Sequence, residues 1–159
     1  MNGGKIMQTQ YEINDETMAI LTIDKNYSEV YEMNEHYIVE QASNKIMEDS
    51  CRYFGSSLEG RRKGTEYMIG VNYKAPIIVE ESKEIIFFPT SSTRENSNWI
   101  RLKYIKSYYR DGDVIFIVFE NGTKIAIKTS YGIIDNQVLR ATRLESALRG
   151  RKTAKKTVM

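Results

Sequence analysis

The chain has 159 residues, 41% of them hydrophobic, and a formal net charge of +2, which suits one domain with a sizeable core. The longest apolar run, residues 114–119, is too short to cross a bilayer, and we find no secretory signal, so we expect a cytoplasmic protein without membrane contact. One cysteine excludes an intramolecular disulfide, and only one histidine accompanies it, so no zinc site of the usual kinds is expected.

The first part of the chain, to about residue 40, is typical of β structure. Residues 17–23 predict one strand, residues 27–33 a second and residues 36–39 a short third. Residues 1–10 show no periodicity, and we expect them to be disordered.

A pair of helices is predicted next. The first begins near Ser43, because apolar side chains recur at helical spacing on one face; they are Ile46 or Met47, Cys51 and Phe54. Gly55 can adopt the left-handed conformation that ends a helix. Ser56 followed by Glu59 fits a capping box, which predicts a second, short helix.

Two helices joined by a tight turn are compatible with two structures. One is the helix-turn-helix motif of DNA-binding proteins, and the other is a helical hairpin packed on a sheet. Gly60 and Gly64 would weaken the second helix as a recognition helix, which favours the hairpin. Downstream, Pro76 precedes a predicted strand at residues 77–79, and another strand at residues 84–88 ends at Pro89.

The third part predicts a three-stranded meander and a C-terminal helix. Asp111-Gly112 and Asn121-Gly122 are typical of two-residue hairpin turns. With such turns Phe116 would pair with Ser107 and Ile127, and Val114, Phe116 and Val118 would share one apolar face with Ile105 and Ile125. The opposite face, which carries Ile115, Ile117 and Phe119, would need a cover.

The expected cover for that face is a helix over residues 132–148, although a second subunit is the alternative. The helix has an apolar stripe formed by Ile134, Val138, Ala141, Leu144 and Leu148. Residues 149–159 lack core-forming side chains and predict a flexible basic tail. The fold class expected is therefore α+β: an antiparallel sheet and meander with a central helical hairpin and a C-terminal helix, as one domain over residues 11–148.

No catalytic constellation is apparent. Ser56, Ser57, Ser91 and Ser92 lack a credible base, since His36 is the only histidine. Cys51 on a helical apolar face is better explained as a small core residue than as a nucleophile. We therefore expect no enzyme, cofactor or metal site.

Cations are the features that point to binding. Residues 51–65 hold four of them around a glycine turn, and such density suits a nucleic acid. Charge is also polarised: residues 1–50 carry three Lys or Arg against ten Asp or Glu, and residues 140–159 carry seven against one. Phosphate contacts supply affinity and salt dependence. The candidate DNA-binding residues are Arg52, Arg61, Arg62, Lys63, Lys74, Arg94, Arg140 and Arg143.

Each of these cations has an alternative interpretation as a solvated surface charge, and asymmetry of this size is common among soluble domains. Arg94 illustrates the choice. It follows a run of small hydrogen-bonding residues, 90–93, after the rigid Pro89. Such a loop suits a narrow minor groove, where arginine is favoured, but Ser and Thr after a proline also build ordinary turns.

Several of these segments, taken in order, carry a family resemblance over residues 45–145. Beyond the stretch at 51–65 there are a Tyr-Lys-Ala-Pro-Ile run at 73–77 and a Phe-Phe-Pro-Thr-Ser-Ser-Thr-Arg run at 87–94. Further matches follow at Trp99-Ile100 and, more weakly, at residues 119–122 and 130–131, at Gln137 and at Arg140-Ala141. In this pattern the chain resembles the ComK-type competence transcription factors of Gram-positive bacteria.

The resemblance implies a transcriptional activator of the genes for DNA uptake in genetic competence. Proteins of this kind bind paired A/T-rich boxes of double-stranded DNA through the minor groove, as dimers arranged in pairs. An adaptor controls their level by passing them to a cytoplasmic protease. The resemblance assigns no DNA contact to individual residues, so the candidate cations follow from charge and from the matching motif.

The chain also departs from the family pattern. Family members continue well beyond the last predicted helix, whereas this chain ends at Met159, and residues 1–44 match poorly. A second hypothesis is therefore a shortened paralogue that modulates a full-length regulator, or its proteolytic adaptor, through protein contacts without useful DNA affinity.

Overall fold

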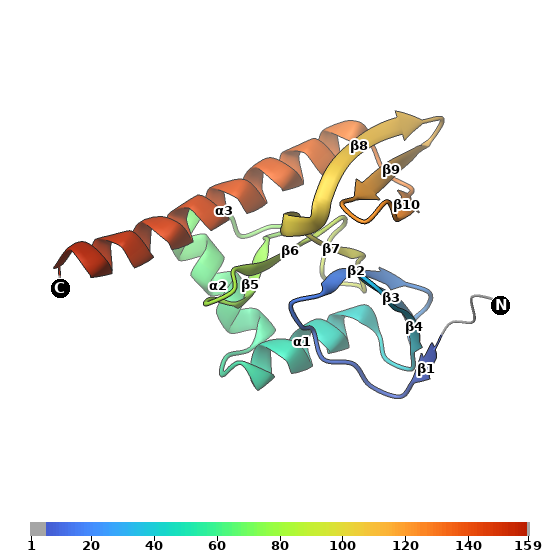
Figure 1. Cartoon of the computed structure of the whole chain (residues 1–159), viewed down its shortest axis with the longest axis horizontal. Coiled ribbons are helices and arrows are strands. Elements are labelled where there is room, and N and C mark those ends of the chain that lie inside the picture. Colours follow the sequence, from blue (N-terminus) through green and yellow to red (C-terminus); the bar gives the residue numbers. More distant parts are fainter. Residues whose placement is uncertain (1–5, 159) are drawn as a thin grey trace.

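The computed structural model describes residues 6–158, with side chains described through Ala154. It confirms the expected α+β fold, with two sheets, a central pair of helices and a long C-terminal helix (Figure 1). The larger sheet has seven strands in the order β1-β4-β3-β2-β7-β6-β5, and the smaller has the order β10-β9-β8. The strands of the larger sheet are β1 (Ile6–Gln8), β2 (Thr17–Thr22), β3 (Ser28–Glu32), β4 (His36–Val39), β5 (Ile77–Glu80), β6 (Ile85–Pro89) and β7 (Trp99–Arg101).

β1 corrects the expectation that residues 1–10 are disordered. Ile6 pairs with Tyr37 and Gln8 with Val39, in parallel with β4. The Gln8 carbonyl also accepts a 2.8 Å hydrogen bond from the backbone of Glu40. The backbone of β4 offers an unpaired edge, and bonds to that edge need no side-chain periodicity, so the sequence pattern does not show them. Residues 1–5 lie outside the described residues.

The central strands of the seven-stranded sheet are buried on both faces. On one face, Ile20, Phe87 and Trp99 pack with Met47 and Cys51 of α1 (Ser43–Tyr53). On the other face, Ala19, Ile86, Phe88 and Ile100 belong to a cluster that includes the smaller sheet and the C-terminal helix. The molecule therefore has layers, with α1 on one side of the sheet and the small sheet and α3 (Tyr131–Val158) on the other (Figure 1). α2 (Leu58–Ile69) lies beside β5 and reaches from α1 to α3.

The connection between α1 and α2 (Leu58–Ile69) is a Schellman turn, and the helical hairpin packed on the sheet is confirmed. Gly55 has φ +88°, and its N–H bonds to the Arg52 carbonyl while that of Ser56 bonds to the Cys51 carbonyl. The predicted capping box is wrong by one residue. Ser57, not Ser56, caps α2 by accepting a 2.9 Å bond from the Gly60 N–H, because the turn takes one more residue than expected.

The three-stranded sheet confirms the predicted meander but not its registers. β8 (Ile105–Asp111) turns into β9 (Val114–Phe119) through residues 112–113, so Phe116 pairs with Tyr109. β9 turns into β10 (Lys124–Ile127) through residues 120–122, and Phe116 pairs with Ala126 rather than Ile127. Gly122, at φ +89°, completes this longer loop, which is a common three-residue hairpin connection.

The extra loop residue decides which side chains face the core, because a slip of one residue turns a strand over. Ile125 and Ile127 consequently share one buried face with Ile115, Ile117 and Phe119. The expected grouping of Ile125 and Ile127 with the opposite side of β9 is therefore wrong. The predicted cover is confirmed, since this face belongs to the same buried cluster as Ile134, Ala141, Leu144 and Leu148 of α3.

α3 (Tyr131–Val158) runs along this layer and extends past it at the C-terminal end (Figure 1). The tail expected to be flexible from residue 149 is helical through Val158. The beginning of this segment is held by an ion pair, in which Arg149 lies 2.9 Å from Glu84, and by a 2.8 Å hydrogen bond that Lys152 donates to the Glu81 carbonyl. These partners lie far away in sequence, so composition alone does not reveal them. The side chains of Lys155 and Lys156 lie outside the described residues.

Candidate nucleic-acid interface

The cations of the central stretch are mostly neutralised by carboxylates of the same protein. Arg52 pairs with Glu48 at 2.9 Å, and Arg62 donates from Nε to Glu59 at 2.9 Å. Arg61 pairs with Glu81 at 3.3 Å, and its side chain is only 18% exposed. Lys63 is exposed, and no ion pair forms to it within the described residues. The stretch therefore presents less free positive charge than its sequence suggests.

Three predicted arginines come together around residues 69–74, which connect α2 to β5. Arg62 donates to the Asn72 carbonyl at 3.3 Å, Arg140 to the Tyr73 carbonyl at 3.0 Å and Arg143 to the Ile69 carbonyl at 3.2 Å. These bonds bring a helix remote in sequence, α3, beside α2. They fix the guanidinium groups at the protein surface. A carbonyl carries no net charge, so these bonds leave the charges of Arg140 and Arg143 in place, whereas Arg62 is also paired with Glu59.

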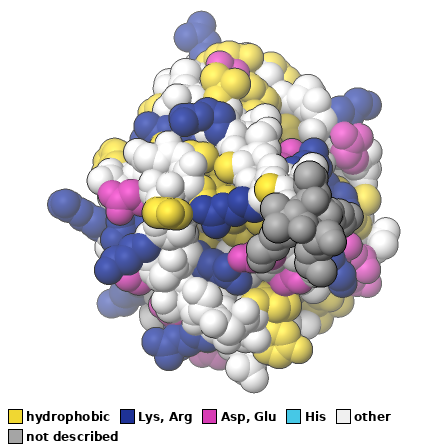
Figure 2. All heavy atoms as spheres, turned by 90° about the vertical axis from the view of Figure 1, so that its left-hand side faces the viewer, with side chains coloured by type: hydrophobic (Ala, Val, Ile, Leu, Met, Phe, Trp, Pro, Cys, Tyr) yellow, Lys and Arg dark blue, Asp and Glu magenta, His cyan; other side chains and the backbone are white. Residues whose placement is uncertain are grey.

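Lysines and tyrosines complete this surface. Tyr67 and Tyr73 are 84% and 60% exposed. Lys74 Nζ lies 5.7 Å from the Tyr73 ring, and the Arg151 guanidinium lies 5.6 Å from the Tyr67 ring. We call this surface the α2–α3 face; it comprises Arg62, Lys63, Tyr67, Tyr73, Lys74, Arg140, Arg143 and Arg151. Figure 2 shows Lys and Arg side chains spread over this end of the molecule, with hydrophobic side chains between them.

The α2–α3 face has a net positive charge. Its six cations are accompanied by two nearby carboxylates, Glu59 and Glu66, and Glu66 accepts a 3.1 Å bond from Asn72. Exposed aromatic rings beside cations suit a nucleic acid backbone with accessible bases or sugars.

The remaining predicted residues lie elsewhere. Arg52 is on the last turn of α1, where it lines a polar cavity of about 740 Å³ together with Tyr11 and Asp49. Arg94 is exposed on the β6–β7 connection, and no ion pair forms to it within the described residues. That connection is anchored by Asn44, whose amide donates to the Thr93 carbonyl at 3.0 Å. Arg94 therefore extends from a supported loop, with the exposed Glu95 beside it in the sequence.

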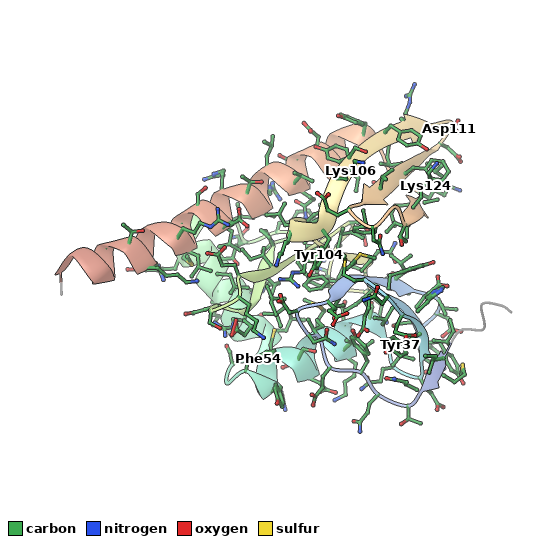
Figure 3. The ribbon with its side chains drawn as sticks, viewed as in Figure 1. Tyr37, Phe54, Tyr104, Lys106, Asp111 and Lys124 are labelled. Atoms are coloured by element: carbon green, nitrogen blue, oxygen red, sulfur yellow. The ribbon has the colours of Figure 1, made fainter. Side chains whose placement is uncertain are left out.

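Several exposed residues whose charge or aromatic ring suits nucleic-acid binding were not among the residues predicted from the sequence. Tyr67 has no sequence signal, Tyr73 was noted only as part of the run at residues 73–77, and Arg151 only as part of the basic tail. The exposure of an aromatic side chain is set by packing and has no local sequence signal. Lys106 and Lys124 were seen only as members of the meander. Figure 3 places both on the three-stranded sheet, well away from α2.

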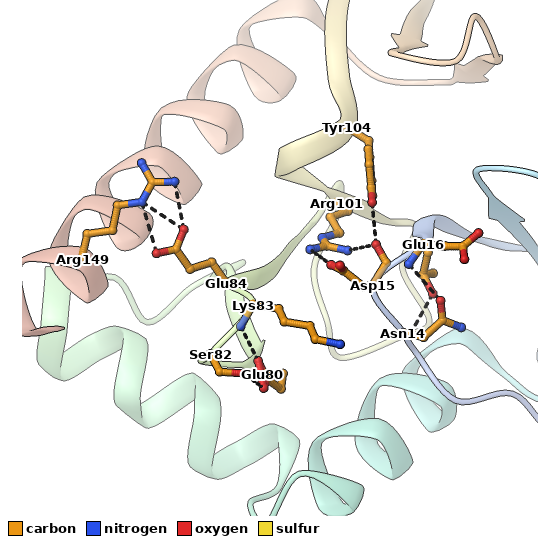
Figure 4. A network of polar contacts seen from close by, with 11 residues as sticks. Asn14, Asp15, Glu16, Glu80, Ser82, Lys83, Glu84, Arg101, Tyr104 and Arg149 are labelled. Atoms are coloured by element: carbon orange, nitrogen blue, oxygen red, sulfur yellow. Dashed lines mark hydrogen bonds and ion pairs between the residues drawn. The ribbon is translucent and has the colours of Figure 1, made fainter.

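Arg101, which is not among the eight predicted cations, is buried and unavailable for a ligand. Arg101 is 0% exposed and pairs with Asp15 at 3.0 Å, while the Asp15 carbonyl accepts bonds from both Arg101 and the Tyr104 hydroxyl (Figure 4). Desolvation opposes ionisation of Asp15, but the hydrogen bond and charge of Arg101 outweigh it and lower the pKa of that carboxyl. This group joins the segment before β2 to β7 and is structural.

Cys51 belongs to the apolar core. Burial raises the pKa of the Cys51 thiol to about 12, and the side chain is fully buried, which confirms a core residue. In the part of the chain that the structure describes, no three His, Cys, Asp or Glu side chains gather to hold a metal ion. Across residues 6–158, no helix is both long and apolar enough to span a bilayer.

The fold and its surface define an α+β protein with a cationic, tyrosine-bearing face. The family model described as ComK protein matches residues 8–153, and the chain belongs to the ComK family. It is 36% identical over 146 residues to the competence transcription factor of Bacillus subtilis (strain 168), a match that covers 89% of this chain and 76% of that relative. No solved structure gave a significant match. All eight predicted cations lie within the matched residues.

Proposed function

We propose that this protein is a DNA-binding transcriptional regulator that activates competence genes and recognises A/T-rich boxes largely through the minor groove. Membership of the ComK family and the relative named competence transcription factor support the biological role. We further propose that it acts in the cytoplasm as a homo-oligomer and that a protease adaptor is a partner. The observation that carries DNA binding is the α2–α3 face, where six cations meet two exposed tyrosines.

The two parts of this proposal have different physical origins. Cations of the α2–α3 face would neutralise phosphates and so provide affinity that is independent of sequence. A preference for A/T-rich boxes would come from groove width and from the ease of deforming the duplex. Arg94, exposed on its anchored loop, is the predicted cation best placed to enter a narrow groove.

The test of phosphate binding is a salt series with an A/T-rich duplex. The log–log slope of affinity against salt is expected to become shallower by about 0.9 for each phosphate contact removed. Lys63→Gln and Lys74→Gln together should therefore reduce the slope by about 1.8. Lys25→Gln, at an exposed lysine in the β2–β3 connection, is the matched control and should leave the slope unchanged. An unchanged slope in the double variant would remove the α2–α3 face from the interface.

One observation favours the second hypothesis, a module that acts through protein contacts alone. Arg52, Arg61 and Arg62, three of the four cations of the central stretch, are paired with carboxylates. That hypothesis predicts no saturable DNA binding by the wild-type protein even at low salt. The same salt series distinguishes the two functions.

A further inference from the structure

A cavity beside α1 lies in the acidic first part of the chain, which the proposed DNA contacts hardly use. Residues 1–50 carry ten Asp or Glu against three Lys or Arg. The cavity, of about 740 Å³, lies between α1, the strands β3 and β4 and the connection from β1 to β2 (Figure 1). Its volume is within the range of ligand sites, roughly 300–1,000 Å³. We call it the α1 cavity; its lining includes Tyr11, Glu32, Tyr37, Asp49, Arg52 and Tyr53.

Glu32 is held in the α1 cavity by neutral donors alone. Its carboxylate accepts hydrogen bonds from the Tyr11 hydroxyl and, at 3.0 Å, from the Asn14 amide, and Tyr37 also bonds to it. Burial and then the bond to Glu32 raise the pKa of the Tyr11 hydroxyl, so it remains a donor. No lysine or arginine pairs with Glu32 in the part of the chain that the structure describes. The carboxylate is therefore oriented and still able to accept a cation.

The other charged groups that line the cavity are two paired residues and Glu12. Asp49 pairs with Lys45 at 2.9 Å, and Arg52 pairs with Glu48 at 2.9 Å. Each of these pairs has no net charge, so neither supplies a cation to Glu32.

The negative charge that remains comes from glutamates. Glu12 is exposed and has no ion-pair partner among the described residues. Glu16 and Glu35, also exposed, lie close enough to act electrostatically on Tyr37, as Glu32 does. The uncompensated charge in and around the cavity is therefore negative, which suits a cationic ligand.

Aromatic rings lie beside this charge. The centroids of the Tyr11 and Tyr37 rings are 5.6 Å apart, and Tyr53, at the end of α1, is 66% exposed. The face of an aromatic ring attracts a cation. The carbon stem of a lysine or arginine side chain also covers apolar surface while its charged end stays at a polar group. Rings beside an uncompensated carboxylate therefore suit a lysine or arginine side chain.

A second cavity, of about 320 Å³, continues the first. The two share Glu12, Asn14 and Tyr53, and the second is also lined by the apolar side chains of Ile13 and Phe54. We call the two cavities together the α1 groove. A groove with an acidic end and a more apolar end suits an extended protein segment better than a small amine.

The charges of the second cavity determine which end receives the cation. Asp15 pairs with Arg101, and Glu80 accepts a 2.7 Å bond from the Lys83 N–H (Figure 4). The Lys83 side chain adds a positive charge here and has no ion-pair partner within the described chain. A cationic side chain is therefore expected in the α1 cavity and an apolar one beside Phe54.

We propose that the α1 groove binds a basic segment of a partner protein, with a lysine or arginine side chain at Glu32 and an apolar side chain beside Phe54. The groove shares no residue with the α2–α3 face, and this inference goes beyond the proposed function. Neutral donors hold the Glu32 carboxylate in place, so the segment binds without breaking an ion pair of that residue. The excess of carboxylates in residues 1–50 favours the approach of a basic partner.

The experiment titrates the full chain by calorimetry with two capped peptides, Gly-Lys-Leu-Gly and Gly-Gln-Leu-Gly. The lysine peptide should bind saturably and about tenfold more tightly than the glutamine peptide. Glu32→Gln should weaken binding of the lysine peptide by about tenfold, and Tyr53→Ala by about threefold. Glu120→Gln, at an exposed position in the β9–β10 connection that lines neither cavity, is the matched control and should change neither affinity.

Thermal melting verifies that each variant is folded, and Tyr53→Ala tests the groove at an exposed side chain if Glu32→Gln unfolds the protein. Equal affinity of the wild type for the two peptides would overturn the inference, as would wild-type affinity for the lysine peptide in both groove variants. Tighter binding of free spermidine than of the lysine peptide would rule out the choice of a protein segment. Glu32→Gln should keep wild-type affinity for an A/T-rich duplex, and a parallel loss there would place Glu32 in the DNA site instead.

Discussion

At the scale of single residues, the neighbouring carboxylates and carbonyls determine whether a cationic side chain is available for binding. Arg101 and Lys63 are both positively charged, yet Arg101 is fully buried and bonded to Asp15, whereas Lys63 is exposed. Arg61 is intermediate, because Glu81 holds it near the surface with most of its side chain covered. The sequence does not distinguish these three situations. The carboxylates that pair with Arg61 and Arg101 lie 20 and 86 positions away in the sequence.

The Arg101–Asp15 pair gives a prediction for stability. Asp15→Asn leaves the buried guanidinium without its carboxylate, and we expect a loss of about 2 kcal/mol, reduced from the value for a fully buried pair because Asp15 is partly exposed. Lys45→Gln removes an exposed pair with Asp49 and should change stability by less than about 0.5 kcal/mol. Urea denaturation measures both, and equal effects would contradict a structural role for the buried pair.

The same pair gives a pH dependence. The pKa of Asp15 is lower in the folded protein than in the unfolded chain, so its stabilisation is present above the unfolded value and disappears as pH falls through the folded one. The difference in stability between wild type and Asp15→Asn should be complete above about pH 5 and fade below about pH 4. A difference that is undiminished at pH 3 would show that the carboxylate charge is not its cause.

At the scale of elements, the turn between α1 and α2 depends on backbone conformation rather than on contacts. Gly55 has φ +88° and open space around its Cα, and Gly64 has equally open space but lies inside α2. Gly55→Ala should therefore destabilise the protein by about 1 kcal/mol, while Gly64→Ala should stabilise it by about 0.5–1 kcal/mol. Thermal unfolding checks the opposite signs, and two changes of the same sign would rule out the conformational explanation.

The meander illustrates what local sequence signals do not determine. Its two turns are evident from Asp111-Gly112 and Asn121-Gly122, but their lengths are not, and one additional residue before β10 reverses the faces of that strand. Ile125 and Ile127 join the buried side, and Phe116 remains outside beside Lys124. This register buries the largest number of apolar side chains. The residues of the turn do not indicate how many side chains each register would bury.

At the scale of the whole molecule, α3 joins parts of the chain that are distant in sequence. Gln137 is 1% exposed, and its amide donates to the carbonyls of Lys74 and Pro89 at 2.8 and 2.7 Å. It therefore fixes α3 against both the connection that carries the α2–α3 face and the end of β6. The orientation of Arg140 and Arg143 on the same helix depends on this attachment.

Gln137→Ala tests that attachment. The buried carbonyl of Pro89 and the partly buried carbonyl of Lys74 would lose their donor, and we expect a loss of about 3 kcal/mol in the free energy of unfolding. Asn136→Ala, at the exposed neighbouring position, should change it by less than about 0.5 kcal/mol. Hydrogen exchange of α3 amides should increase in Gln137→Ala alone. Protection equal to that of wild type would mean that apolar packing holds the helix without the amide.

Much of the fold follows from the sequence because its signals are local. Apolar alternation and spacing, glycine turns and prolines predicted the α+β class, the strands at residues 17–23, 36–39 and 77–79, the helical hairpin and the helix that covers the meander. Family motifs in residues 45–145 indicated the ComK family, to which the chain belongs. Only the tertiary structure decided the register of β10, the pairing of β1, the helical continuation of α3 and which cations remain unpaired. The pairing of β1 with β4, the contacts of Arg149 with Glu84 and the pairing of Arg61 with Glu81 join segments far apart in sequence, and such bonds leave no periodic pattern in either segment. The register of β10 depends instead on which side chains the core buries, because a shift of one residue turns the strand over.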